Sequence, residues 1–414
     1  MNLALINIKQ LITVRSNGHR VKLRGDMREL GIIENAAVLV NEDTIYWVGR
    51  MEDLGVGDLH EVEVVDCIEN VVMPGFIDAH THLVFAGSRE DEFSMRSSGS
   101  TYAEIALKGG GILNTVQHVR SAQKKELKKN ARKYLNALLR NGTTTVEIKS
   151  GYGLNNDDEI KMLEAINELK KEEVIGIVPT FLGAHAYPPE FLTHKEKYVT
   201  EILEKMLPYI ASHHLAEFCD VFCEKGFFEY ADTEKILATG KNLGMQPKIH
   251  AEELTPSRGS LIAASVGAVS ADHLEHITEE GITALANAGV VAVLLPGVSF
   301  FLNHCYAPAR ELITNGVPVA IATDFNPGSC MSYSMPMMMT IACTHMGMSP
   351  EEAITAATLN AAAAINRSDS IGSIEKGKKA DFVVLDIPNY KFLPYHFGEN
   401  HVEKVIKDGV VLEF

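Results

Sequence analysis

Short apolar segments alternate with helical stretches through the middle of the chain, between residues 75 and 323. Leu127–Asn141 and Asp158–Glu172 carry apolar residues at helical spacing, and Thr278–Ala288 lies between a possible N-cap and Gly289. Strands that alternate with helices favour a parallel sheet, so this pattern predicts an α/β fold of the (β/α)8 TIM-barrel type, with a doubly wound sheet as the alternative. The eight candidate strands are Gly75–Asp78, Thr143–Ile148, Val174–Phe181, Phe218–Phe222, Pro247–His250, Ala268–His273, Val290–Leu295 and Val317–Thr323.

Both ends of the chain have the pattern of short β-strands instead. Alternating apolar segments fill much of residues 1–73, and residues 370–414 contain FVVLD and VEKVIKDGVVLEF, the latter with an Asp408-Gly409 hairpin turn. A chain of 414 residues also exceeds the roughly 250–300 at which a single core stops growing. We therefore predict a smaller β-sandwich domain built from residues 1–73 and 370–414, and a barrel domain built from residues 74–369.

The charge balance limits the kinds of partner. The formal net charge is −16, which argues against nucleic acid and against anionic membrane surfaces. No apolar run approaches the roughly 20 residues of a membrane span, and the six cysteines lack the spacing of a disulfide framework. We expect a soluble cytoplasmic protein, in which an anionic substrate needs a local cation to hold it.

Metal-capable side chains follow several of the predicted strands. His80 and His82 end the first strand, and residues two apart in a strand point to the same face. Neutral imidazole is the commonest protein ligand for metal ions, and barrel enzymes place their chemistry at the carboxyl ends of the strands. The fifth and sixth strands end in His250 and His273, and His185 and Asp324 come after the third and eighth strands.

Three imidazoles and a carboxylate, with room for water, make an open catalytic metal site. His80, His82 and His250 suit the ligand role, and Asp324 suits binding the metal and orienting water. Glu253 lies three residues after His250 and is a candidate proton carrier. Its neighbour Glu252 is the competing carboxylate.

The chain resembles the imidazolonepropionase family of the amidohydrolase superfamily in six segments: PGFIDAHTHLVFAGSREDEF, EIKSGYGL, FLGAHAYP, KIHAEEL, ADHLEH and IATDFNPGS. A seventh, GSIEKGKKADFVVLD, resembles the return of that superfamily into its small domain. The resemblance implies a (β/α)8 barrel with a β-sandwich made from both chain ends. It also implies hydrolysis of the ring amide of 4-imidazolone-5-propanoate to N-formimidoyl-L-glutamate, a step of histidine degradation.

The same resemblance assigns roles to individual residues. It implies one zinc or iron ion, held by His80, His82, His250 and Asp324, and we also expect a homodimer. Tyr152 stands between two glycines, so we expect it on an exposed loop. The implied catalytic residues are Glu253, His273 and Asp324, and the implied substrate-binding residues are Arg89, Tyr152, His185, Glu253, Asn326, Gly328 and Ser329.

Two other functions fit parts of this pattern. The His250-x-x-Glu253 spacing also suits a mononuclear deaminase of a purine or pyrimidine ring, and ammonia release would separate it from a ring-opening hydrolase. A metal-free scaffold is disfavoured because every expected ligand is present. The fourth strand, FCDVFC, does not end in the lysine that two-metal members of the superfamily use, which favours a single metal ion.

Overall fold

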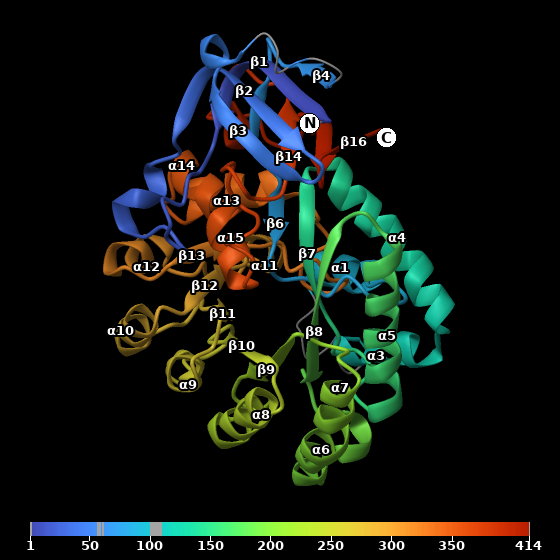
Figure 1. Cartoon of the computed structure of the whole chain (residues 1–414). Helices are drawn as coiled ribbons and strands as arrows, with labels where there is room; N and C mark the ends of the chain where they lie inside the picture. Colours follow the sequence, from blue (N-terminus) through green and yellow to red (C-terminus); the bar gives the residue numbers. More distant parts are fainter. Residues whose placement is uncertain (1, 56–58, 60–61, 100–109, 414) are drawn as a thin grey trace.

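The centre of the molecule is a barrel of eight parallel strands that follow one another in chain order from β6 to β13 (Figure 1). This computed structural model describes residues 2–55, 59, 62–99 and 110–413. The backbone N–H of His82 donates to the carbonyl of Phe325, and that of Asp324 donates to the carbonyl of His80, so the chain after the last strand pairs with the chain after the first. The strands are β6 (Phe76–Asp78), β7 (Thr143–Lys149), β8 (Gly176–Ala184), β9 (Phe218–Cys223), β10 (Gln246–Ala251), β11 (Ser270–His273), β12 (Val291–Leu294) and β13 (Val319–Ile321).

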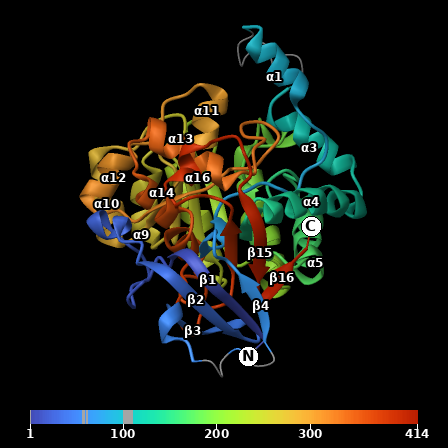
Figure 2. The same cartoon turned by 90° about the horizontal axis from the view of Figure 1, so that it is seen from above.

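Helices surround the barrel, and local sequence signals explain where two of them begin (Figure 1). The side chain of Asn155 caps α5 by accepting from the N–H of Asp158, and the side chain of Thr278 caps α10 by accepting from the N–H of Gly281. Figure 2 shows α1 at the rim of the fold, beyond the other helices. The helices are α1 (Glu90–Ser97), α3 (Ile112–Ser121), α4 (Lys124–Arg140), α5 (Asn156–Glu172), α6 (Lys195–Glu201), α7 (Leu207–Ser212), α8 (Tyr230–Asn242), α9 (Gly259–Val266), α10 (Glu279–Ala288), α11 (Pro296–Leu302), α12 (Ala309–Asn315), α13 (Met335–His345), α14 (Pro350–Ala356), α15 (Leu359–Ala364) and α16 (Phe392–Tyr395).

Strands from both ends of the chain form a second sheet, and the two termini lie at this end of the molecule (Figure 1). The sheet branches at β1, which pairs with β4 near its start and with β5 near its end. Asp408 and Gly409 form the predicted hairpin turn between the last two strands, both with positive φ. The strands are β1 (Leu3–Ile12), β2 (Ile32–Asn41), β3 (Thr44–Arg50), β4 (Glu63–Asp66), β5 (Val71–Pro74), β14 (Phe382–Leu385), β15 (Val402–Lys407) and β16 (Val410–Leu412).

The two faces of this terminal sheet pack into different cores. Val383 and Leu385 belong to the core that also fills the barrel, whereas Phe382 and Val384 belong to a separate core within the terminal strands. Side chains alternate between faces along a strand, so β14 contributes to both cores at once. The predicted fold class was a (β/α)8 barrel with a smaller β-sandwich domain formed by both chain termini. It is confirmed in the barrel and in a separate β-sheet built from both ends of the chain, while the domain boundaries at residues 73/74 and 369/370 stay a prediction. Among the described helices, none has the length and apolar character needed to cross a membrane.

Candidate active site

Four side chains from the ends of three strands converge at the carboxyl end of the barrel. Ring nitrogens of His80, His82 and His250 lie within 4.8 Å of one another. The Oδ1 atom of Asp324 lies 3.4 Å from Nε2 of His80 and 3.4 Å from Nε2 of His82. The structure therefore brings together the four residues that the sequence predicts as metal ligands.

The outer nitrogens of two of these histidines are held by buried carboxylates that the sequence analysis missed. His80 Nδ1 lies 2.6 Å from Asp272, and His250 Nδ1 lies 3.1 Å from Asp220. A carboxylate at Nδ1 fixes the proton there and leaves the Nε2 lone pair free to bind a metal. Both histidines are therefore oriented with a ligand atom toward the convergence point.

The convergence point fits a divalent metal ion. His80 Nε2 and Asp324 Oδ1 are buried, and neither has a hydrogen-bond partner in the described structure. Unpaired buried polar atoms are costly, and a cation between them would satisfy both. Burial also lowers the pKa values of His80, His82 and His250, which keeps the imidazoles neutral, as metal binding requires.

The backbone is strained where two of the central residues leave their strands. His273 has φ +80 and Asp324 has φ +50, in the left-handed region that non-glycine residues rarely adopt. Burial is the main cause that raises the pKa of Asp324 to about 8, and the neighbouring Glu253 carboxylate adds to it. A cation at this point would favour the ionised carboxylate.

A cavity of about 470 Å³ opens above these side chains. It is lined by every predicted site residue except His80, which lies fully buried beneath it. Those residues are His82, Arg89, Tyr152, His185, His250, Glu253, His273, Asp324, Asn326, Gly328 and Ser329.

Tyr152 differs from the prediction made from its neighbours. Its place between two glycines predicts an exposed loop, but the residue is only 3% exposed, and its ring lies 5.7 Å from that of His82 and 5.6 Å from that of His185. Gly151 has φ +111, a conformation that glycine adopts readily, and Tyr152 after it lines the cavity. His185 Nδ1 lies 3.0 Å from the carbonyl of Gly151, which leaves Nε2 as an acceptor when the ring is neutral. Burial is the main cause that lowers the pKa of His185 to about 3.

Arg89 is fixed at the wall of the cavity by a partner that the sequence analysis did not identify. Its Nε and Nη2 atoms lie 2.9 and 2.8 Å from Glu92 on α1. The remaining nitrogen, Nη1, lies against Gly328, where a Cβ atom would come within 2.1 Å of it. A cation is thus available in a strongly acidic chain, and Arg96 of α1 also lines the cavity.

Glu253 and His273 face each other, with Oε2 and Nε2 3.7 Å apart. Burial raises the pKa of Glu253. Burial alone would lower the pKa of His273, but the carboxylates of Glu253 and Glu275 outweigh it and raise the pKa to about 10. Glu252 points elsewhere and accepts from Ser260, so Glu253 is the carboxylate that reaches the cavity.

The loop after the last barrel strand supports Asp324. Asn326 Nδ2 donates to Asp324 Oδ2 at 3.0 Å and to Ser329 Oγ at 2.6 Å, and the Ser329 hydroxyl lies 3.2 Å from Asp324. The backbone N–H groups of Gly328 and Ser329 both donate to Asn326 Oδ1. This loop therefore positions the Asp324 carboxylate, and the substrate-binding role of Asn326, Gly328 and Ser329 stays a prediction.

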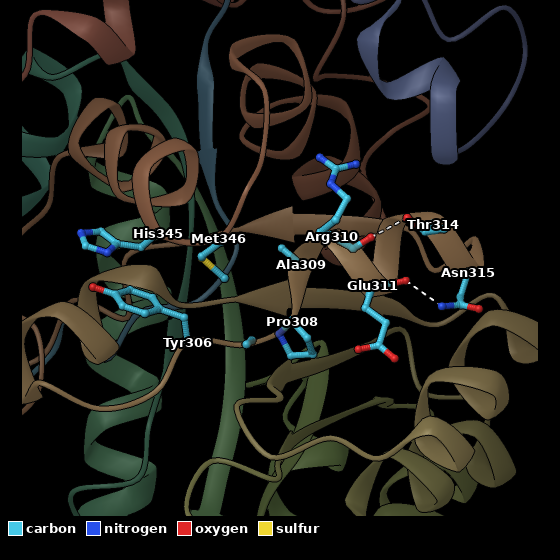
Figure 3. A pocket seen from close by; sticks show the side chains of 10 residues that line it. Tyr306, Pro308, Ala309, Arg310, Glu311, Thr314, Asn315, His345 and Met346 are labelled. Carbon is cyan, nitrogen blue, oxygen red and sulfur yellow. Dashed lines mark hydrogen bonds between the residues drawn. The ribbon is translucent and has the colours of Figure 1, made fainter.

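A second cavity, of about 430 Å³, lies beside α12 and shares no lining residue with the first (Figure 3). Tyr306 and His345 stack at its edge with ring centroids 4.9 Å apart. The guanidinium group of Arg310, which also lines this cavity, donates to Glu352 and to the carbonyl of Gly347. The arginine of this second cavity is therefore already paired with a buried carboxylate.

Comparisons with known proteins agree with this site. The model of the amidohydrolase family matches residues 247–412. A protein named imidazolonepropionase from Clostridium tetani is 47% identical over 413 residues, covering 99% of this chain and 98% of its own. Another of the same name, from Geobacillus kaustophilus, is 48% identical over 407 residues, covering 98% and 96%.

Solved structures show the same fold at low identity. An adenosine deaminase from Xanthomonas campestris with bound zinc superimposes with a TM-score of 0.70 at 19% identity, covering 99% of this chain and 92% of its own. Atrazine chlorohydrolase from Arthrobacter aurescens TC1, complexed with zinc, gives a TM-score of 0.75 at 18% identity, covering 99% and 95%.

The barrel and the histidine-aspartate cluster at its carboxyl end define a hydrolase of the amidohydrolase type. Within this class, the chain is 47–48% identical over almost its whole length to the two imidazolonepropionases described above. The chain belongs to the imidazolonepropionase family.

Proposed function

We propose that this protein hydrolyses the ring amide of 4-imidazolone-5-propanoate and releases N-formimidoyl-L-glutamate, a step of histidine degradation. The observation that carries the proposal is the pairing of a histidine-aspartate cluster with a fixed arginine in one cavity. The names of the full-length relatives support the same reaction.

In this proposal His80, His82, His250 and Asp324 hold one divalent ion, zinc or iron. The unpaired buried atoms at the convergence point support that assignment. When bound, such an ion supplies Lewis-acid chemistry and lowers the pKa of water toward neutrality.

Three further side chains bind the substrate. Arg89 has Nη1 left to donate to the propionate, because Glu92 occupies its other side. His185 uses Nε2 to accept from a ring N–H, since its Nδ1 donates to a backbone carbonyl. The buried hydroxyl of Tyr152 completes this wall, and Gly328 leaves the room that Arg89 needs.

Glu253 and His273 act on the reacting atoms together with Asp324. Asp324, held by Asn326 and Ser329, orients the attacking water. The cationic His273 stabilises negative charge on the carbonyl oxygen as the tetrahedral intermediate forms. Glu253, whose pKa is raised by burial, takes the proton of the water and returns it to the departing ring nitrogen, with Asp324 as the competing carrier.

The experiment that tests the reaction generates 4-imidazolone-5-propanoate from urocanate with a urocanase. Loss of its ultraviolet band is then followed with purified protein, with and without a chelator, while ammonia is assayed in parallel. Fast, chelator-sensitive loss without ammonia supports the proposal. Loss at the spontaneous rate by metal-loaded protein contradicts it, and ammonia release would point to the deaminase alternative instead.

The assembly and location of the protein belong to the same proposal. We propose a homodimer, which light scattering of the purified protein at several concentrations would test. We also propose a cytoplasmic location, which fractionation of the producing cells would test.

A further inference from the structure

A layer of buried charge lies directly beneath the predicted metal ligands. None of its five side chains is exposed to solvent. The contacts join β7 to β11, which are not neighbours in the sheet, so they cross the interior of the barrel. The layer consists of Glu147 and Lys149 on β7, Asp220 on β9, Lys248 on β10 and Asp272 on β11.

Two members of this layer hold the metal-binding histidines, as described above: Asp272 holds His80, and Asp220 holds His250. A carboxylate that pairs with Nδ1 sets both the tautomer and the orientation of the ring. The orientation of each carboxylate depends in turn on its other partners. Asp272 Oδ1 accepts from the hydroxyl of Ser270 at 2.6 Å, whereas Asp272 Oδ2, the oxygen next to His80, also faces Lys149.

Lys149 binds both of these carboxylates. Its ammonium lies 2.7 Å from Asp220 Oδ2 and 3.5 Å from Asp272 Oδ2, and it donates to Glu147 at 2.8 Å. The ammonium therefore donates hydrogen bonds to Asp220 and Glu147, and it attracts Asp272 by charge at the longer distance. Burial alone would lower the pKa of Lys149, but Asp220 and Glu147 outweigh it and raise the pKa, so the group stays charged.

The second buried lysine makes a different set of contacts. Lys248 lies 3.6 Å from Glu147 and 3.9 Å from Asp272, and it donates to the carbonyl of Ala79 at 3.1 Å. Its ammonium also lies 5.5 Å from the ring of Phe218. Lys248 therefore shares Asp272 with Lys149, at the longer distance, and among the contacts of the described residues it has none with Asp220.

We propose that Lys149 is a positioning residue, whose ammonium fixes Asp220 and Asp272 so that His250 and His80 present Nε2 to the metal. This inference rests on the metal site of the proposed function. It adds that one lysine, which touches no ligand atom, couples two of the three metal-binding histidines. Loss of the ammonium would release both carboxylates from their common partner and loosen both histidines together.

The test measures metal binding rather than turnover. Lys149→Met keeps a long apolar side chain and removes the ammonium, and Lys248→Met is the matched control with the same burial and the same charge change. The zinc dissociation constant of each stripped protein is measured by competition with a chromophoric chelator. Stability of each stripped protein is measured by denaturant unfolding. We expect zinc binding to weaken about 10–100-fold in Lys149→Met, as for other outer partners of metal ligands, and less than about threefold in Lys248→Met.

A charge-balanced pair of variants keeps the test decisive if Lys149→Met does not fold. Glu147→Gln/Lys149→Met removes one acid with the ammonium, and Glu147 contacts neither histidine-holding carboxylate as a hydrogen-bond partner. Its control is Glu147→Gln/Lys248→Met. We expect Glu147→Gln/Lys149→Met to bind zinc more weakly than Glu147→Gln/Lys248→Met, by the same factor that separates the two single variants.

The outcomes distinguish the inference from the proposed function. Wild-type zinc affinity in Lys149→Met or in its charge-balanced form, with only the stability of the stripped protein reduced, would overturn the positioning role alone. Equal weakening in the Lys248 variants would also overturn it, because loss of buried charge would then explain the effect. Absence of stoichiometric zinc or iron binding by the wild-type protein would instead overturn the proposed metal site, and the inference with it.

Discussion

Gly328 is predicted to control substrate affinity through the space that it leaves for Arg89. A Cβ atom at this position would lie 2.1 Å from Arg89 Nη1 and 2.7 Å from Cζ. Gly328 does not have a positive φ, so alanine fits the backbone, and its N–H can still donate to Asn326. The Gly328→Ala substitution therefore acts mainly by displacing the guanidinium.

The size of the effect follows from the contact that is lost. Glu92 fixes the other side of Arg89 at 2.8 and 2.9 Å, so the guanidinium cannot simply slide away while keeping its direction. A hydrogen bond to a charged group is worth about 1.5–3 kcal/mol. We expect the KM for 4-imidazolone-5-propanoate to rise about 10–100-fold, and kcat to fall by much less.

Steady-state kinetics with two matched variants test this reasoning. Gly25→Ala is the control, since a Cβ atom there meets nothing within 4 Å and the residue has no positive φ. In an Arg89→Met background, Gly328→Ala is expected to add little, because the displaced group is already gone. A KM within about twofold of wild type for Gly328→Ala would refute the steric argument.

Three more outcomes are expected. Asp324→Asn should lower kcat about 10²–10⁴-fold, because the carboxylate is lost. Circular dichroism should change little, since asparagine tolerates the φ of +50 at this position. A near-normal kcat would contradict the role of the carboxylate. Removal of the metal should lower the free energy of unfolding by about 2.7 kcal/mol, compared with protein in a free metal concentration 100 times the dissociation constant. Denaturant unfolding curves that coincide for metal-loaded and metal-stripped protein would argue against a specific site. Burial opposes ionisation of Glu352, but Arg310 and Arg28 outweigh it and lower the pKa of this carboxyl group in the folded protein. The ionised group therefore stabilises the fold at pH values above its unfolded pKa of about 4.3. This stabilisation is lost as the pH falls through the lower pKa of the folded protein. Glu352→Gln should therefore cost about 1–3 kcal/mol at pH 7 and progressively less below pH 4, as followed by urea unfolding at several pH values, whereas a cost independent of pH would contradict the pairing.

The positions of the metal ligands could be predicted because periodicity and topology agree. Apolar segments alternating with helices predict a barrel, and barrel geometry gathers whatever follows the strands, which here includes His80, His250 and Asp324. The choice between Glu252 and Glu253 could not be made from spacing. It depends on the backbone leaving β10 with a positive φ at Glu252, which sends that side chain toward Ser260.

The residues behind the ligands were missed because they lie inside segments that are otherwise apolar. Glu147 and Lys149 are two apart on β7, as are Lys248 and His250 on β10, so each pair shares one face of its strand. Such polar pairs at a spacing of two within a buried strand were the signal available in the sequence. Glu92 was missed although it lies three residues after Arg89, a spacing at which opposite charges pair at the start of a helix.

The central claim is that this protein opens the ring of 4-imidazolone-5-propanoate by adding water to its amide. The substrate is prepared beforehand in ordinary water, because urocanase itself adds a water oxygen to the ring. Mass spectrometry of the product then formed in water enriched in heavy oxygen tests the claim most directly, with metal-loaded and metal-stripped protein compared. The account predicts a product that keeps both ring nitrogens and carries one heavy oxygen atom, formed only by the metal-loaded protein. A product that has lost nitrogen as ammonia, or no product above the spontaneous reaction, would contradict it.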